Sequence, residues 1–505
     1  MLRSRPFPRR AAAVAAFAAT AAALAAPAVA AAPQTGGGSA AKRPNVILVL
    51  IDDAGYADLS CYNPRAPART ENIDRLAREG VRFTQFYVNS PICSPSRTAL
   101  LTGQYPARWN VTSYIAARQE NDARGIAHWL DPNAPSLARA LSGAGYATGH
   151  FGKWHLGGGR DIAEAPLITQ YGFDASLTQF EGLGDRVLAM MDTAPDGSGG
   201  RKMGLGAASE KLGRGSVRWV PRHQVTKTFV DGALGFVRDA EKAGKPFFVN
   251  VWPDDVHSPF DPPADLRGDG SKKALYRGVL VNMDRQLAPL FDYVRSSPAL
   301  RDNTLILVMS DNGPEPGAGS AGGLRGTKGQ IYEGGVREPL VAWGPGLIPA
   351  ARRGTVNQTA VFSSVDLTAS ILRLAGATMP ESAAAPGGAK AAYAPDGEDV
   401  RPALFGGEKA AGRTAPLFFK RPPDRPGPPR APLPDLAVRE GNWKLLLPDE
   451  NGASAAQLYD LAADRGETKD VAAQHPDVVA RLKEKLLAWN RTLPAASKKA
   501  AAARP

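Results

Sequence analysis

Apolar residues occur in short, continuous runs between residues 45 and 309, and each run ends in polar or glycine-containing sequence. Runs of this kind, rich in Val, Ile and Leu, are typical of strands that are buried on both faces of a parallel sheet. They predict strands at residues 45–51, 81–88, 146–151, 246–252 and 304–309.

Segments with helical character separate these strands. Helix-start residues and closing glycines place the helices at residues 70–79, 135–143, 225–243, 273–296 and 365–376. The alternation of strands and helices predicts an α/β fold with a mainly parallel, doubly wound sheet.

The remaining sequence divides the chain into five parts. We predict a signal peptide at residues 1–32, a linker at 33–42, a large α/β domain at 43–400, a small α+β domain at 401–496 and a disordered tail at 497–505. Residues 181–216 are rich in Gly without a sustained period, so we expect a long surface insertion there. The Pro-rich residues 421–434 predict a semi-rigid loop. A hairpin at 436–447, a strand at 457–461 and a helix at 476–492 are expected after it.

The first 32 residues have the features of a secretory signal. A basic start leads into an Ala-rich apolar run at residues 11–26, and Ala28-Val29-Ala30 forms an A-x-A cleavage pattern. We therefore expect a periplasmic or secreted protein. Arg9-Arg10 lacks the hydrophobic residues that follow a twin-arginine pair, which favours general Sec export over the twin-arginine route. The alternative is an uncleaved anchor, but the run is short for a span, and no other stretch predicts stable membrane insertion.

The charge balance favours an anionic ligand. The 505 residues contain 61 Lys and Arg against 49 Asp and Glu, a formal charge of +12, of which +8 remains beyond the first ten residues. Such an excess suits an anionic substrate or polymer. It does not by itself indicate nucleic acid, because no Lys/Arg run or alternation of aromatic and basic residues stands out.

Polar side chains directly follow apolar strands at four places. These are Asp52-Asp53, Lys153 with His155, His257, and Asp311-Asn312. Ligands of open α/β sheets bind beyond the carboxyl ends of the strands, so these groups can converge. Lys153 and His155 share one face of an extended segment, because side chains two residues apart point the same way. The alternative is that such residues only form turns.

The two acidic pairs form an all-oxygen set. Three carboxylates and one amide, from Asp52, Asp53, Asp311 and Asn312, suit a hard divalent cation. Ca²⁺ and Mg²⁺ both fit this description, whereas zinc would prefer His and Cys. For each pair, an Asx turn or a helix cap is the structural alternative.

The segment PICSPSRTALLTG at residues 91–103 combines a Cys with a predicted helix start. Pro95 and Ser96 are suited to opening a helix. The free N–H groups and dipole of that helix would favour an anion at position 93. Arg97, one turn further on, can pair with the oxygens of such an anion. The alternative is a buried free Cys, the commonest state of a lone Cys.

Several of these segments together resemble the type I sulfatase family. Cys93, Pro95 and Arg97, followed by Leu-Thr-Gly at residues 101–103, are similar to the family signature. The further similarities are G-K-W-H-L-G at 152–157, His257 with Pro259, L-R-G-T-K at 324–328, E-G-G-V-R-E-P at 333–339 and both acidic pairs. Thr70-Glu71-Asn72 is a departure, because the family usually has T-P-N. The resemblance spans residues 44 to about 465.

This resemblance implies a fold, a modification and a metal. The fold would be alkaline-phosphatase-like, with a large mixed, mainly parallel sheet between helices and a small C-terminal antiparallel sheet with a helix. A maturation enzyme would convert Cys93 to formylglycine, whose aldehyde hydrate attacks sulfate esters, and Cys61 would be left over. Ca²⁺, in preference to Mg²⁺, would be held by Asp52, Asp53, Asp311, Asn312 and the nucleophile at position 93.

The resemblance also implies a role for each remaining residue. Arg97, Lys153 and Lys328, together with the metal, would neutralise the oxygens of the sulfuryl group. His257, alone or with Lys328, would donate a proton to the leaving alcohol. His155 would take a proton from the second hydroxyl of the nucleophile, which releases sulfate. A packed Trp154 flanked by exposed polar residues, and a solvated basic loop at Lys328, are the structural alternatives.

Three functions are compatible with these residues. The first is hydrolysis of an aryl sulfate or a sulfated carbohydrate, which releases inorganic sulfate. The second is a phosphodiesterase or phosphonate monoester hydrolase of the same superfamily. The third is an inactive secreted protein that binds sulfated glycans. A degenerate site should have lost some of its reactive residues, yet all of them are present, so the sequence favours an enzyme.

Overall fold

The computed structural model describes residues 43–192, 200–380, 394–406, 410–421, 433–449 and 451–494. The predicted signal peptide, the linker and the C-terminal tail lie outside these residues, as does most of the Pro-rich segment at 421–434. Cys61 and Cys93 are both free thiols.

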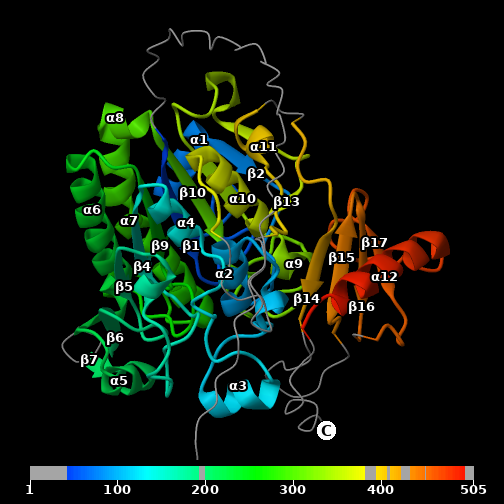
Figure 1. Ribbon diagram of the computed structural model, residues 1–505, viewed down its shortest axis with the longest axis horizontal. Helices are drawn as coiled ribbons and strands as arrows, with labels where there is room; N and C mark the ends of the chain where they lie inside the picture. The colour runs from blue at the N-terminus through cyan, green and yellow to red at the C-terminus, as the bar shows by residue number, and fades with distance from the viewer. Residues whose placement is uncertain are drawn as a thin grey trace, which may run out of the picture. The chain divides into compact units, whose positions relative to one another are not determined.

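A mixed sheet of 11 strands forms the centre of the described chain (Figure 1). Its strands are β1 Asn45–Ile51, β2 Val81–Phe83, β4 Ala147–Gly152, β5 Ala175–Thr178, β6 Arg186–Asp192, β7 Gly200–Lys202, β8 Val217–Pro221, β9 Phe247–Trp252, β10 Thr304–Ser310, β11 Leu340–Trp343 and β12 Thr355–Asn357. Their order is β12-β2-β11-β10-β1-β9-β4-β5-β6-β7, and β8 pairs with β6. The central pairs β10·β1, β1·β9, β9·β4 and β4·β5 are parallel, which confirms the predicted α/β fold.

Helices cover both faces of this sheet, because β1 places alternate side chains in two separate cores. Ile47, Val49 and Ile51 share one core with α1 Glu71–Glu79, α6 Val225–Lys242 and α7 Lys272–Ser296. The intervening residues of β1 share the other core with α2 Cys93–Thr102, α4 Leu137–Gly143 and α10 Ser364–Ala375 (Figure 1). The shorter helices are α3 Arg118–Arg124, α5 Gly204–Lys211, α8 Pro298–Arg301, α9 Glu333–Val336 and α11 Arg401–Phe405.

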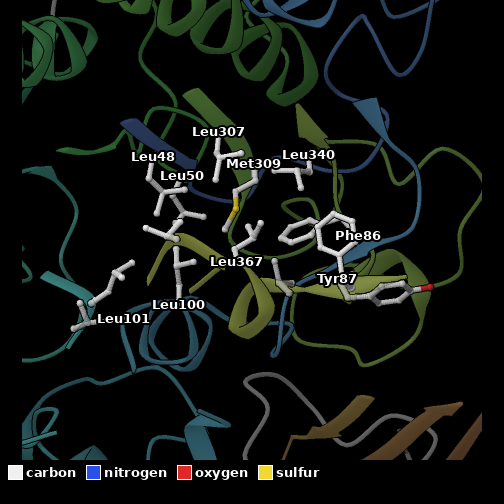
Figure 2. Close-up of a cluster of buried hydrophobic side chains, with 14 of the residues drawn as sticks. Leu48, Leu50, Phe86, Tyr87, Leu100, Leu101, Leu307, Met309, Leu340 and Leu367 are labelled. Carbon is white, nitrogen blue, oxygen red and sulfur yellow. The ribbon is translucent and has the colours of Figure 1, made fainter. Parts of the chain in front are cut away.

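Helix α2 is fixed by the second of these cores. Figure 2 shows Leu100 of α2 close to Leu48 and Leu50 of β1, with Leu367 of α10 beside them. Gly103 ends the helix in the left-handed conformation (φ 67°), and its N–H caps the last turn. The packing of α2 therefore holds the first residue of the helix, Cys93, in place.

A second, antiparallel sheet lies in the C-terminal part of the chain. It contains β14 Leu417–Lys420, β15 Leu436–Glu440, β16 Trp443–Leu447 and β17 Gln457–Asp460. Helix α12, Pro476–Arg491, buries Leu482 and Leu486 in the same core as Val438 and Leu445 of this sheet. The predicted small sheet with a helix is therefore present, while the domain boundary at residue 400 stays a prediction.

Three sequence-based expectations differ from the structure. Helix α2 begins at Cys93, two residues before the predicted start, because Ile92 already has the extended conformation of a helix cap. The expected strand at 81–88 is two strands: β2 in the large sheet and β3 Phe86–Tyr87, which pairs with β13 Phe362–Ser363. The expected surface insertion at residues 181–216 is partly an extension of the large sheet, since β6, β7 and α5 lie there and β6 pairs with β5.

Candidate active site

The two acidic pairs meet at one edge of the large sheet. Asp52-Asp53 follows β1 and Asp311-Asn312 follows β10, and the two strands are parallel neighbours with Ile51 opposite Ser310. This register sets the pairs side by side at the carboxyl ends of the strands, where open α/β sheets bind ligands. All four side chains are fully buried.

The acidic pairs fit a hard divalent cation. Oxygens of Asp52, Asp53 and Asp311 lie within 4.8 Å of one another. Burial and the charge of Asp52 raise the pKa of Asp311 to about 8, because like charges repel strongly away from water. Asn312 donates from Nδ2 to Asp53 at 2.7 Å, and its buried Oδ1 has no hydrogen-bond partner among the described residues. Crowded carboxylates beside a free amide oxygen form the ligand type that Ca²⁺ and Mg²⁺ prefer.

Two of the expected site residues have a strained backbone. Asp53 has a φ of 68° and His155 a φ of 56°, in the left-handed region that residues other than glycine rarely adopt. Strain of this kind costs about 1–3 kcal/mol and concentrates at functional sites. At Asp53 the backbone N–H donates to Oδ1 of Asp311 at 3.1 Å, so the strained turn joins the ends of β1 and β10.

Three predicted cations neutralise these carboxylates. The contacts are Arg97 to Asp52 (3.0 Å) and Asp311 (2.8 Å), Lys153 to Asp52 (2.7 Å) and Lys328 to Asp53 (2.6 Å). Arg97 also donates to the carbonyl of Lys153 at 2.8 Å, and its guanidinium lies 5.1 Å from the ring centre of Trp252. Although burial lowers the pKa of Arg97, its two carboxylate partners outweigh that effect and raise the value. The site is therefore a buried network of alternating charges.

Cys93 lies at the start of α2 and borders this network. Its sulfur is within 4.8 Å of a carboxylate oxygen of Asp52 and a ring nitrogen of His257. Burial raises the pKa of the Cys93 thiol well above its ordinary value, although Lys153 and Lys328 oppose the rise. As an unmodified thiol it is therefore a poor nucleophile, because the thiolate is the reactive form.

His257 points one ring nitrogen into the site. Its Nδ1 lies 2.8 Å from the carbonyl of Ser258, which can only accept a hydrogen bond, so Nδ1 carries the proton. Nε2 then faces Oδ2 of Asp53 at 3.8 Å. Burial, followed by the charges of Lys328 and Lys153, lowers the pKa of His257 to about 4.

His155 lies beside the network rather than in its centre. Its Nε2 donates to the carbonyl of Ile115 at 3.0 Å, and its Nδ1 is 3.0 Å from Oε2 of Glu181. Burial, then Lys153 and Arg97, lowers its pKa well below the ordinary value. Lys153 and His155 both follow β4, so His155 lies next to the other predicted residues although it contacts none of the carboxylates of the acidic pairs.

Two buried side chains at the site were not predicted from the sequence. Glu181 contacts Lys153 at 3.6 Å and His155, and Arg222 contacts Asp254 at 2.9 Å. Both follow short strands, β5 and β8, in a region where Gly-rich sequence hides the strand pattern. Glu181 could have been found from the pattern that located the acidic pairs, a polar side chain shortly after a strand, here the strand at residues 175–178.

A cavity of about 890 Å³ opens over these groups. Its polar part includes Cys93, Lys153, His257 and Lys328. Another part is apolar and comes from Val187, Ala189, Met203 and Leu205, on β6 and around the start of α5. Leu205 is 38% exposed and is the one large hydrophobic side chain classed as exposed among the described residues. The site thus combines a floor that carries cationic side chains with an apolar wall.

Comparison with known proteins identifies the family. The Sulfatase family model matches residues 44–377, which is more than half of the chain. The chain belongs to the sulfatase family. The sulfatase is 31% identical to arylsulfatase A of Homo sapiens over 88% of this chain and 87% of that relative. It is 28% identical to N-acetylgalactosamine-6-O-sulfatase of Bacteroides thetaiotaomicron, over 88% of this chain and 93% of that one.

The fold of the sulfatase is shared with solved structures. The crystal structure of Ps i-CgsB superposes with a TM-score of 0.71 at 25% identity, covering 90% of this chain and 94% of that chain. The alkaline-phosphatase-like architecture expected from the sequence is therefore confirmed, and the family assignment makes the protein a sulfuric ester hydrolase. Members of this family generally use a divalent metal ion and formylglycine.

Across the described residues, every helix is too short or too polar to pass through a membrane.

Proposed function

We propose that the sulfatase releases inorganic sulfate from an aryl sulfate or a sulfated carbohydrate, with formylglycine at position 93 and Ca²⁺ as its metal. Asp52, Asp53, Asp311 and Asn312 would hold the cation. The observation that carries this proposal is the position of Cys93, at the first residue of α2 and within 4.8 Å of ligand atoms of Asp52 and His257. A group at this position borders the cation site, the cavity and a proton-carrying side chain at once.

The residues of the chain divide the chemistry between them. Formylglycine supplies an aldehyde hydrate and Ca²⁺ supplies a fixed positive charge once both are in place. Arg97, Lys153 and Lys328 bind and neutralise the sulfuryl oxygens as negative charge moves toward the leaving group. Nε2 of His257 is the ring atom that can donate to the departing oxygen, because Nδ1–H is already committed to the carbonyl of Ser258; the negative charge of a bound sulfate ester would offset the charges of Lys328 and Lys153 that lower the pKa of this ring.

The burial of Cys93 bears on its maturation. The residue is 1% exposed in the folded chain and is enclosed by the first turn of α2. A modifying enzyme cannot reach a side chain of this kind in the native state. We therefore infer that the maturation enzyme acts on the chain before it folds, which is also compatible with export to the periplasm or beyond.

The relatives favour sulfate over phosphate as the group transferred. Arylsulfatase A and N-acetylgalactosamine-6-O-sulfatase, to which the chain is similar over most of its length, are named for sulfate esters. The substrate of a phosphodiesterase or phosphonate monoester hydrolase carries the same single negative charge but two organic substituents, so it would need room for a second group beside the same cations. None of the contacts described above favours such a substrate, so it serves as the comparison in the test.

The test combines mass spectrometry with substrate comparison. The tryptic peptide containing residue 93, from protein made in the native host, is expected to be about 18 Da lighter than its unmodified form, as thiol-to-aldehyde conversion requires. At equal concentrations, 4-nitrophenyl sulfate should be hydrolysed faster than 4-nitrophenyl phosphate and bis(4-nitrophenyl) phosphate. An unmodified thiol in fully active enzyme, or faster phosphodiester hydrolysis, would contradict the proposal.

A further inference from the structure

Glu181 is a buried carboxylate that the mechanism above does not use. Its side chain is 7% exposed, it follows β5, and it forms part of the cavity wall together with His155. Its Oε2 and the Nδ1 of His155 are both buried, and neither has a hydrogen-bond partner among the described residues. These two atoms lie 3.0 Å apart. The two atoms are close enough to share one proton, but their present alignment is not that of a hydrogen bond, so a rotation of either side chain is needed to form it.

One hydrogen bond holds the imidazole of His155 and another holds its backbone. Its Nε2 donates to the carbonyl of Ile115 at 3.0 Å, so Nε2 holds a hydrogen in every protonation state of the ring. The backbone N–H of His155 donates to the carbonyl of Glu181 at 3.0 Å. Nδ1 is therefore the ring atom that can take up a proton, and Glu181 faces it.

The charges around the pair explain why a carboxylate is needed there. Lys153 lies 3.6 Å and Arg160 lies 3.4 Å from the Glu181 carboxylate. After burial, the charges of Lys153 and Arg97 lower the pKa of His155, whereas the charge of Asp52 raises it. A second positive charge on the ring would therefore be unfavourable unless Glu181 balanced it.

We propose that Glu181 is a positioning residue for His155, and that the two side chains act together as the proton acceptor of the site. This inference rests on the proposed function. The pair begins as a neutral ring beside an ionised carboxylate. A hydroxyl group in the cavity loses its proton to Nδ1: its O–H bond breaks, an N–H bond forms, and the electron pair stays on the oxygen, which becomes an alkoxide. The product is an imidazolium–carboxylate pair without net charge, which returns the proton to solvent through the cavity.

The isosteric change Glu181→Gln separates this role from a structural one. The Gln amide has the same shape and can donate to Nδ1, so it supports the ring but occupies the atom that must accept the proton. We expect kcat for 4-nitrophenyl sulfate to fall about 10²-fold, the usual scale of a proton-transfer contribution, with an unchanged Tm. The acid limb of the kcat/KM profile should move to lower pH, because removing the carboxylate lowers the pKa of His155.

A double-mutant cycle tests whether the two side chains form a unit. His155→Gln alone and the double variant His155→Gln/Glu181→Gln should lose about as much kcat as Glu181→Gln, because residues that act together are not additive. Glu164→Gln is the matched control, since Glu164 is exposed and paired with Arg118 outside the cavity wall. It should keep the wild-type kcat and pH profile.

The outcomes are distinguishable from failure of the proposed function. If the wild-type, modified enzyme does not hydrolyse sulfate esters, the proposed function fails. If it does, then a Glu181→Gln variant within threefold of wild-type kcat, or additive losses in the cycle, overturns the pairing. Neutron diffraction of the wild-type enzyme gives a second measurement that needs no variant. It should find hydrogen on Nε2 of His155 and, at low pH, a further hydrogen between Nδ1 and Oε2; an Nδ1 that carries no hydrogen at low pH overturns the inference.

Discussion

The guanidinium of Arg97 contacts acceptors from three separate segments: Asp52 after β1, Asp311 after β10 and the carbonyl of Lys153 after β4. One buried side chain thus links three strand ends. Arg is suited to this because its planar group presents several donors at fixed angles, which a Lys ammonium cannot do. Even so, burial and the charge of Asp52 outweigh Arg97 and raise the pKa of Asp311 to about 8.

Removing the bound cation should therefore destabilise the site. A divalent ion relieves the repulsion between Asp52, Asp53 and Asp311, and an ion that binds the native state at 100 times its Kd stabilises it by about 2.7 kcal/mol. We expect EDTA treatment to lower both Tm and activity, and added Ca²⁺ to restore both at lower concentration than Mg²⁺. Asp311→Asn should raise the Ca²⁺ concentration needed for the Tm shift. A Tm that is insensitive to EDTA and Ca²⁺ would argue against a metal at this site.

At the scale of elements, the buried strands were predictable and the apolar cavity wall was not. β1 and β10 are continuous apolar runs that end in acidic residues, so sequence alone placed Asp52 and Asp311 together. Glu181 and Leu205 lie among short strands and a Gly-rich helix. These elements are too short to show the apolar spacing of two residues that indicates a strand or of 3.6 residues that indicates a helix. β6 pairs with β5, and β7 and β8 pair with β6 in turn, so these strands depend on pairing between segments rather than on a local sequence pattern.

Gly152, at the end of β4, shows how closely the element before Lys153 is packed. A Cβ at this position would lie 2.2 Å from the carbonyl oxygen of Trp252, and the backbone φ of 132° already excludes most other residues. We expect Gly152→Ala to destabilise the protein by about 2–4 kcal/mol and to lower kcat, because Lys153 must move with the strand. Urea denaturation and kinetics at 25 °C would measure both effects.

Gly143 provides the matched control for this substitution. It is the last residue of α4, and no atom lies within 4 Å of the position of an added Cβ. Gly143→Ala should leave kcat unchanged and alter stability by no more than about 1 kcal/mol, in the stabilising direction, because Ala favours the helix. Equal losses in the two variants would show that close packing at Gly152 is not the cause.

The exposure of Leu205 at the start of α5 is explained if the apolar wall contacts the leaving group. Leu205→Asp should raise KM for 4-nitrophenyl sulfate about 10-fold, since partial burial of one Leu against an aromatic ring contributes 1–2 kcal/mol of the binding energy. The Tm should not change, because the side chain is 38% exposed in the free enzyme. Initial rates over a range of substrate concentrations would detect this. An unchanged KM would place the leaving group elsewhere in the cavity.

At the scale of the whole chain, a buried ion cluster joins the C-terminal sheet to the segment that carries Lys328. Lys444 of β16 lies 2.9 Å from Glu333 of α9 and 3.0 Å from Glu467, and all three side chains are fully buried. Tyr87 of β3 also donates to Glu333 at 2.6 Å. Glu333 is five residues beyond Lys328, so the cluster ties the position of Lys328, a cation proposed to bind sulfate, to the small sheet.

One ammonium cannot fully neutralise two carboxylates. Glu333 has the closer set of cations, and although burial opposes it, Lys444 and Arg337 hold its pKa down at about 2. At Glu467 burial dominates and raises the pKa to about 7, with Lys444 opposing the rise. Loss of Lys444 would therefore leave both carboxylates buried without their common partner.

We expect Lys444→Met to destabilise the protein by about 3–5 kcal/mol at pH 8, the usual cost of removing one partner from a buried ion pair. The deficit relative to wild type should shrink as the pH falls toward 5. The reason is that Glu467 has a folded-state pKa above its unfolded value, so protonation favours the folded state, and this preference is stronger without Lys444. Urea denaturation at several pH values would measure it.

The control for this prediction is Lys485→Ala, which removes an exposed contact with Glu440 on the same sheet. That variant should change stability by less than about 0.5 kcal/mol at every pH, because exposed ion pairs contribute little. Lys444→Met should also lower kcat more than Lys485→Ala does, since it loosens the segment between Glu333 and Lys328. A deficit that grows as the pH falls, or is the same in both variants, would mean that the cluster does not join the sheet to the site.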